Sequence, residues 1–116
     1  MQIRIKATNI TLSPNIKKYI EEKIAPVEKF LEKSSEIKAD FEIEKLSHHK
    51  KGKVFRAEVN VLVGKKLFRA EALKEDLYQA IVEVKDLLQR EFKRFKEKRR
   101  NNIKKGGRKV RKKEVG

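Results

Sequence analysis

The sequence predicts an α+β fold in which two helices pack on one face of a four-stranded mixed sheet, in the order β-α-β-β-β-α. Four short segments alternate apolar and polar residues, which is the pattern of strands with a single buried face. Two longer segments repeat apolar residues every three or four positions, which is the spacing of amphipathic helices. The chain has 116 residues, of which 38% are hydrophobic, so it is long enough for one domain with one modest core.

The first strand is predicted at residues 2–7, where the odd-numbered positions are apolar. A helix is predicted to begin at Ser13-Pro14, because serine caps free N–H groups and proline at the first helical position loses no hydrogen bond. Pro26 lies inside this helix, and we expect it to kink or divide the helix because proline has no N–H group to donate.

Three further strands are predicted to form an antiparallel meander. The second strand spans residues 37–46 and the third spans residues 54–63, with a polar loop between them. Gly64-Lys65 is a tight-turn signal, after which a fourth strand continues the buried face. Because the first helix lies between the first two strands, it forms a crossover, and these two strands are expected to be parallel if they are adjacent.

The last helix is predicted from about Lys74 to about Arg99. Its apolar residues follow one another at offsets of four, three, four, four and three, which places them on one stripe: Leu77, Ile81, Val84, Leu88, Phe92 and Phe95. Asparagine and glycine pairs then break the pattern, so residues 101–116 are predicted to be a basic, disordered tail behind an α+β domain at residues 1–100. The architecture resembles that of double-stranded RNA-binding domains, which is a likeness of fold alone.

The charge of the chain favours a polyanionic partner. The net charge is +15, and residues 96–116 contain eleven basic residues against two acidic ones. Each lysine or arginine set against a phosphate releases condensed counterions, which favours binding to nucleic acid. No apolar run reaches the roughly 20 residues of a membrane span, and no secretory signal is present. We therefore predict a cytoplasmic nucleic-acid-binding protein without a membrane partner.

Motifs that carry chemistry are absent from the sequence. There is no cysteine, and glycine-rich phosphate loops and nucleophile elbows are missing. His48-His49 lie in a lysine-rich loop without a carboxylate at ligand spacing, so a solvated loop is favoured over a zinc site. We predict that the protein is not an enzyme and has no cofactor, metal or small-molecule substrate. The alternative to a solvated loop is a second phosphate-contacting edge, made of Lys45, His48, His49, Lys50, Lys51 and Lys53.

The exposed face of the last helix separates its charges. The first half carries Glu75, Gln79, Glu83 and Asp86, and the second half carries Arg90, Lys93, Arg94, Lys96 and Lys98. The basic half is either a strip that lies against a phosphate backbone or a solvated helix end, where the helix dipole favours cations. The basic tail favours the first interpretation.

Two residues at the start of this helix have open interpretations. Tyr78 either stacks on a base or is half-buried with its hydroxyl bonded at the rim of the core, and its spacing favours the second role. Asp76 is interpreted as a cap of the helix start.

Two segments resemble ribosome hibernation-promoting factors and their relative, ribosome-associated inhibitor A. Residues 1–31 are similar to the start of these proteins in Asn9-Ile10, Ser13-Pro14 and Val27-Glu28-Lys29-Phe30. Residues 70–96 resemble the second-helix signature of the family in Ala70-Glu71-Ala72, Asp76-Leu77-Tyr78, Ala80-Ile81, Asp86, Leu88, Arg90 and Lys96. The resemblance covers about residues 1–98.

The resemblance implies a domain that binds the small ribosomal subunit, with its 16S-type rRNA, in the channel used by mRNA and by tRNA at the A and P sites. It implies inhibition of translation under stress or in stationary phase. The RNA contacts that it implies are Lys17, Lys23, Lys29, Arg90, Lys93, Arg94 and Lys96, to which we add Lys85 and Lys98 on the same helix. The alternatives are a general double-stranded RNA- or DNA-binding module and a polybasic protein of membrane surfaces or scaffolds.

The sequence departs from the family pattern at three positions. Leu87 and Glu91 replace a lysine and a glutamine that the family usually has, and Pro26 stands where a lysine is common. The sequence also lacks the extra C-terminal domain of long family members. It is therefore either a short-form factor with a basic extension or a long form cut in its linker.

Overall fold

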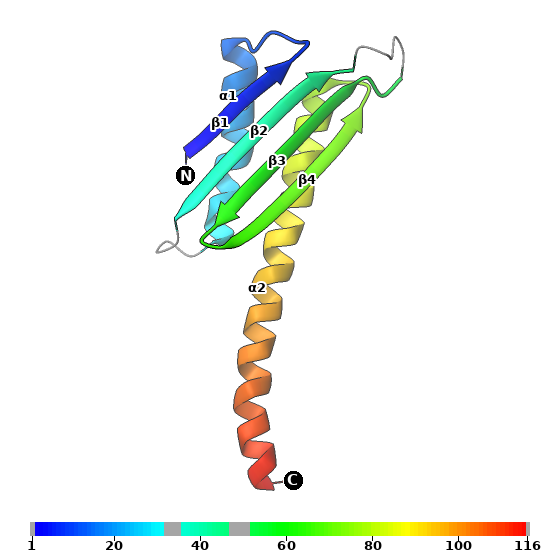
Figure 1. The fold of residues 1–116 in the computed structure, drawn as a ribbon. Helices are drawn as coiled ribbons and strands as arrows, with labels where there is room; N and C mark the ends of the chain where they lie inside the picture. Colours follow the sequence, from blue (N-terminus) through cyan, green and yellow to red (C-terminus); the bar gives the residue numbers. More distant parts are fainter. Residues whose placement is uncertain (1, 32–35, 47–51, 116) are drawn as a thin grey trace.

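The computed structural model describes residues 2–31, 36–46 and 52–115, with side chains described as far as Lys98. The elements follow the predicted order: β1 (Gln2–Thr8), α1 (Pro14–Ile24), the 3-10 helix η1 (Ala25–Phe30), β2 (Ile37–Lys45), β3 (Phe55–Val63), β4 (Lys66–Lys74) and α2 (Leu77–Val115). The strands form one sheet in the order β1-β2-β3-β4, and the pairing of β1 with β2 is parallel while the other pairings are antiparallel. Both helices lie on the same face of this sheet (Figure 1), so the predicted α+β architecture is confirmed.

The core lies between the sheet and the two helices. Ile20 of α1, Phe41 of β2 and Leu88 of α2 are among its fully buried side chains. Phe68 of β4 meets Phe92 of α2 edge-on, with ring centroids 4.7 Å apart. The strand residues that alternate with the buried ones point away from the helices and form the open face of the sheet.

Local signals position the first helix and the last hairpin. The hydroxyl of Ser13 accepts a hydrogen bond of 3.2 Å from the N–H group of Ile16, which caps α1. Pro26 divides the helix as predicted, because the α-helix ends at Ile24 and the chain continues as η1. Gly64 has a φ of +60° in the turn between β3 and β4, a conformation that glycine adopts without steric cost.

Helix α2 differs from its prediction at both ends. It begins at Leu77 and not near Lys74, because Lys74 pairs with Phe55 in the sheet and the carboxylate of Asp76 accepts a 3.1 Å hydrogen bond from the N–H group of Gln79. The helix also continues past the predicted end near Arg99, to Val115. Lysine and arginine have helix propensities close to that of alanine, and each glycine costs only about 1 kcal/mol. The division into a domain at residues 1–100 and a tail at residues 101–116 stays a prediction.

Candidate nucleic-acid interface

Three of the predicted RNA-contacting lysines meet in a hollow between the first helical segment and α2. Its volume is about 220 Å³, and it is lined mainly by Lys23, Pro26, Lys29, Phe30, Lys85 and Gln89, which we call the lysine hollow. Lys23 comes from α1, Lys29 from η1 and Lys85 from α2. Because Pro26 ends the regular α-helix, the chain that follows it runs as a 3-10 helix past α2 and carries Lys29 and Phe30 to the hollow.

Aromatic rings hold the ammonium groups around the lysine hollow. The Nζ atom of Lys23 lies 5.3 Å from the ring centroid of Tyr19. The Nζ atoms of Lys29 and Lys93 lie 5.3 Å and 5.5 Å from the ring centroid of Phe30. These are cation–π distances, so each ring attracts the charge placed over it. The sequence reasoning predicted the lysines but missed Phe30, although it directly follows Lys29 in the segment that carries the family resemblance.

The remaining predicted residues do not form one strip with the lysine hollow. Lys17 lies six positions before Lys23, which is about 120° around the helix, and it is exposed on another flank of α1. On α2, Arg90, Arg94 and Lys98 follow one another at offsets of four, so they share a flank of the helix. Lys96 is exposed near the end of the described side chains.

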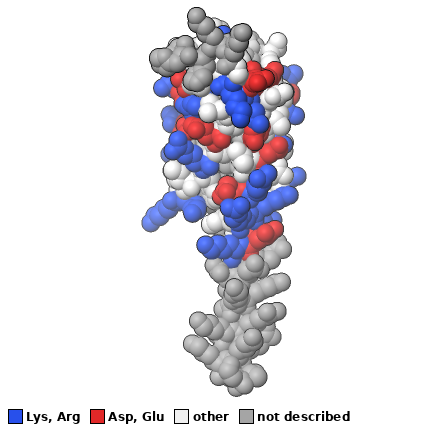
Figure 2. Space-filling view, turned by 90° about the vertical axis from the view of Figure 1, so that its right-hand side faces the viewer, with Lys and Arg blue, Asp and Glu red and all other residues white. Residues whose placement is uncertain are grey.

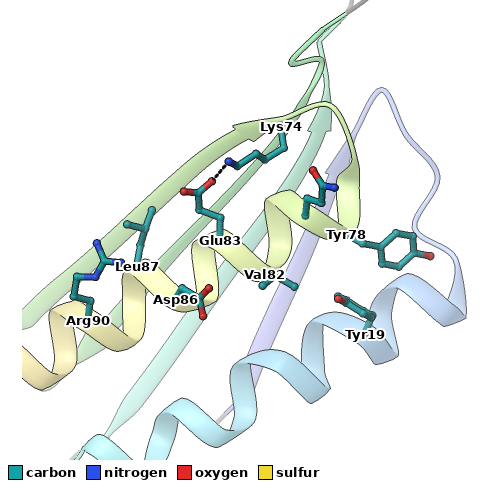
Figure 3. Close-up of a pocket in the computed structure, with 9 residues that line it drawn as sticks. Tyr19, Lys74, Tyr78, Val82, Glu83, Asp86, Leu87 and Arg90 are labelled. Carbon is teal, nitrogen blue, oxygen red and sulfur yellow. Dashed lines mark ion pairs between the residues drawn. The ribbon is translucent and has the colours of Figure 1, made fainter.

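The position of Glu83 shows which way the flank of α2 with Arg90 and Arg94 faces. Its carboxylate forms an ion pair of 2.7 Å with Lys74, the last residue of β4 (Figure 3). Leu87, Arg90 and Arg94 follow Glu83 at offsets of four, three and four, so the row lies on the β4 side of the helix. Arg94 also pairs with Glu91 at 3.3 Å. The predicted basic strip is therefore two rows, one toward η1 and one toward β4.

Lysine and arginine atoms gather at one end of the domain. In the view toward the β4 edge, they cluster where α2 leaves the sheet, whereas both signs of charge alternate farther from that end (Figure 2). Arg90, Lys93, Lys96 and Lys98 form no ion pair within the described ranges of the chain. Their charge is therefore available to an external anion.

Tyr78 is more exposed than its spacing predicted. The residue is 42% exposed, and its hydroxyl has no hydrogen-bond partner among the residues whose side chains are described. The ring meets Tyr19 edge-on, with centroids 4.8 Å apart, at one end of a groove of about 450 Å³ that extends over α2 to Arg90 (Figure 3). The predicted hydroxyl contact at the rim of the core is therefore wrong. The predicted cap by Asp76 is confirmed.

The open face of the sheet carries an ion-pair network that the sequence analysis missed. Arg56 lies between carboxylates of neighbouring strands, at 2.6 Å from Glu42, 2.9 Å from Glu44 and 3.1 Å from Glu71. Burial acts to raise the pKa of Glu42, but hydrogen bonds from Thr8 and Arg56 and the charge of Arg56 outweigh it and lower the pKa. The alternating glutamates of β2, paired in register with Arg56 and Glu58 of β3, are the signal that could have predicted this network.

The second predicted phosphate-contacting edge lies largely outside the described residues. Four of its six residues lie outside the described part of the chain: His48, His49, Lys50 and Lys51. Lys45 and Lys53 are described and are exposed. Within the described ranges, no group of three or more histidine, aspartate or glutamate side chains is placed to hold a metal ion. In the same part of the chain, no helix has the length and apolar character to cross a membrane.

A comparison with protein-family models decides the family. Residues 3–100 match the model described as sigma 54 modulation protein / S30EA ribosomal protein. The chain belongs to this family. The family consists of ribosome-associated factors and not of enzymes, so the predicted absence of enzymatic activity is confirmed by the match.

Curated relatives and solved structures agree with this assignment. A "Ribosome hibernation promoting factor" from Pseudomonas putida is 29% identical over 101 residues, which cover 87% of this chain and 92% of the relative. A "Ribosome hibernation promotion factor" from Deinococcus radiodurans is 24% identical over 97 residues, and this chain spans about half of that relative's length (50%). The crystal structure of the Thermus thermophilus Protein Y N-terminal domain is 30% identical, with a TM-score of 0.69 over 82% of this chain and 99% of that one. A ribosomal subunit interface protein from Coxiella burnetii, 15% identical with a TM-score of 0.66 over 83% of this chain and 98% of that one, shares the fold.

Proposed function

We propose that the protein is a ribosome hibernation factor that binds small-subunit rRNA in the mRNA and tRNA channel, at the A and P sites. Bound there, it inhibits translation under stress or in stationary phase by occupying the space that mRNA and tRNA need. The observation that carries the proposal is the family match over residues 3–100, together with the names of the relatives from Pseudomonas putida and Deinococcus radiodurans.

The basic residues of the helical side support the proposal. A folded rRNA surface presents dense phosphate charge, and exposed lysines and arginines gain free energy there by releasing counterions. Within residues 1–100, we assign the RNA contacts to both rows of α2 and to the helical segments α1 and η1. We propose that residues 101–116, with seven basic residues and one acidic residue, add contacts to phosphate. The protein acts in the cytoplasm and needs no cofactor or small molecule.

The decisive experiment is sedimentation of the full chain with purified small subunits at physiological ionic strength. We expect the protein to migrate with the subunits and to be displaced by mRNA together with tRNA. A variant in which Arg90, Lys93, Arg94 and Lys96 are changed to glutamate should keep its circular dichroism spectrum, because Arg90, Lys93, Arg94 and Lys96 are exposed. The same variant should no longer migrate with the subunits.

Other outcomes would replace the proposal. Equal affinity for small subunits and for any RNA or DNA duplex would favour a general duplex-binding module. Flotation with anionic liposomes, combined with no affinity for subunits, would favour a membrane-surface protein. If the protein does not bind small subunits at physiological salt, it is not a hibernation factor of the proposed kind.

A further inference from the structure

Three lysines in or beside the lysine hollow lie over aromatic rings. A lysine side chain in water rotates freely, and fixing it in one position costs conformational entropy. Around the hollow, the ring of Tyr19 holds Lys23, and the ring of Phe30 holds both Lys29 and Lys93. Part of the cost of ordering these side chains is therefore met before a ligand arrives, which favours binding.

The cations at Phe30 also lack a counter-charge. Lys29 and Lys93 reach the same ring from different elements, and neither forms an ion pair within the described residues. An anion placed beside either ammonium group therefore meets no competing carboxylate among the described residues, and charge-assisted hydrogen bonds to it are strong. Glu22 at the rim of the hollow is paired with Lys18 at 4.0 Å, and Lys85 is paired with Asp86. Because Glu22 and Lys85 are both paired with residues outside the lining, Lys23 and Lys29 supply the positive charge of the hollow that is unpaired within the described residues.

The size of the hollow restricts the ligand. Pockets for whole small molecules typically measure about 300–1,000 Å³. The lysine hollow measures about 220 Å³, and Gln89 adds an amide group that can donate hydrogen bonds to its wall of lysines. A tetrahedral oxyanion fits this space and this donor set better than a nucleoside does.

We propose that the lysine hollow binds one phosphate group and that Phe30 is the positioning residue that presents Lys29 and Lys93 to it. The identity of that phosphate as a phosphodiester of rRNA rests on the proposed function, whereas the hollow itself would also accept free inorganic phosphate. The site gives the domain a fixed register on the RNA backbone, while the exposed lysines elsewhere make interchangeable contacts.

Inorganic phosphate tests the hollow without the ribosome. The full chain, labelled with ¹⁵N, is titrated with phosphate at constant ionic strength, with chloride as the reference anion. We expect saturable shifts of the backbone amides of Phe30, Gln89 and Lys93. Phe30→Leu should remove them and Phe30→Tyr should retain them, because tyrosine keeps the ring. Phe95→Leu is the matched control, because among the described side chains no lysine lies over Phe95, which instead packs against Phe68. Unsaturable shifts spread over all exposed lysines would overturn the proposal.

Affinity for small subunits supplies the second readout. Phe30→Leu leaves the net charge unchanged, and it should weaken binding by about 5- to 30-fold because it removes the two cation–π interactions that orient the lysines. Phe95→Leu should change affinity less than about twofold, and thermal melting checks that both variants are folded. If phosphate binding saturates but the protein does not bind small subunits, the proposed function is wrong and the phosphate site is supported. The opposite result is that small subunits bind, that Phe30→Leu and Phe95→Leu have the same affinity for them, and that phosphate binding does not saturate. The proposed phosphate site is then wrong and the proposed function is supported.

Discussion

The open face of the sheet and the helical side of the molecule both carry many charges but arrange them differently. On the open face, alternate strand positions present five basic and five acidic side chains, and ion pairs across the strands join many of them. On the helical side, acidic residues lie mainly in the first half of α2 and basic residues in its second half. Paired charges cancel each other beyond a Debye length of about 10 Å, whereas separated charges create a field that attracts polyanions. The arrangement of charge, more than its amount, therefore distinguishes the candidate interface from the opposite face.

The largest expected difference between the two faces is in ribosome binding. Changing Lys29 and Lys93 to glutamate should weaken affinity for small subunits by about 100-fold or more, since it removes two charge-assisted hydrogen bonds of about 1.5–3 kcal/mol each. Changing Lys6 and Lys38 on the open face alters the net charge by the same amount and should cost less than about tenfold. Sedimentation with small subunits measures both affinities. If both double variants weakened binding equally, the helical side would not be the preferred interface.

Charges on the open face should matter more for the stability of the fold than for ribosome binding. Arg56→Met leaves several carboxylates close together without their cation, and we expect the free energy of unfolding to fall by about 2–3 kcal/mol. Arg69→Met is the control, because the Arg69 side chain is 64% exposed and its ion pair with Glu58 contributes less than about 1 kcal/mol. Urea midpoints measure both effects. Equal midpoints for the two variants would show that the network around Arg56 is not stabilising.

The C-terminal part of α2 adds positive charge to the helical side, and we expect it to contribute to the salt dependence of binding. Removing residues 101–116 deletes seven basic residues. For each of these residues that binds a phosphate, the truncation should reduce the slope of log K against log salt by about 0.7–0.9. Affinity for small subunits should therefore fall and become less sensitive to salt. A slope that does not change on truncation would mean that this part of the helix binds no phosphate.

The smallest expected effect is on the pH dependence of stability. Hydrogen bonds and positive charge lower the pKa of Glu42 against the opposing effect of burial, so the unfolded chain binds more protons than the folded one in acid. The stabilisation is present above the ordinary pKa of 4.5 and is lost as the pH falls through the lowered value. Glu42→Gln should therefore lose less stability between about pH 6 and about pH 3 than the wild type does. Urea unfolding at several pH values in that range measures the free energy of unfolding of both proteins. If that free energy falls equally in Glu42→Gln and in the wild type, the prediction is wrong.

Local patterns in the sequence determined most of the secondary structure. The alternation of apolar residues located four strands, and the apolar stripe located the last helix. Ser13-Pro14 marked the start of α1, and Pro26 marked its division, because each of these effects depends only on residues within one turn of a helix. The α2 boundaries were missed because Lys74 pairs in the sheet and because charged residues after Arg99 keep the helical conformation.

Which charged side chains come together depends on tertiary packing, which local patterns do not reveal. The sequence located basic residues on both helices, but Lys29 and Lys93, which share the ring of Phe30, are more than sixty positions apart in the chain. The carboxylates around Arg56 come from three strands, because Glu58 of β3 lies 3.8 Å from Arg56 beside the glutamates of β2 and β4. The exposure of Tyr78 depends on where α2 lies against α1. Periodicity reveals the face on which a residue lies because it depends on local backbone geometry, whereas contacts between distant segments depend on register and packing across the whole core.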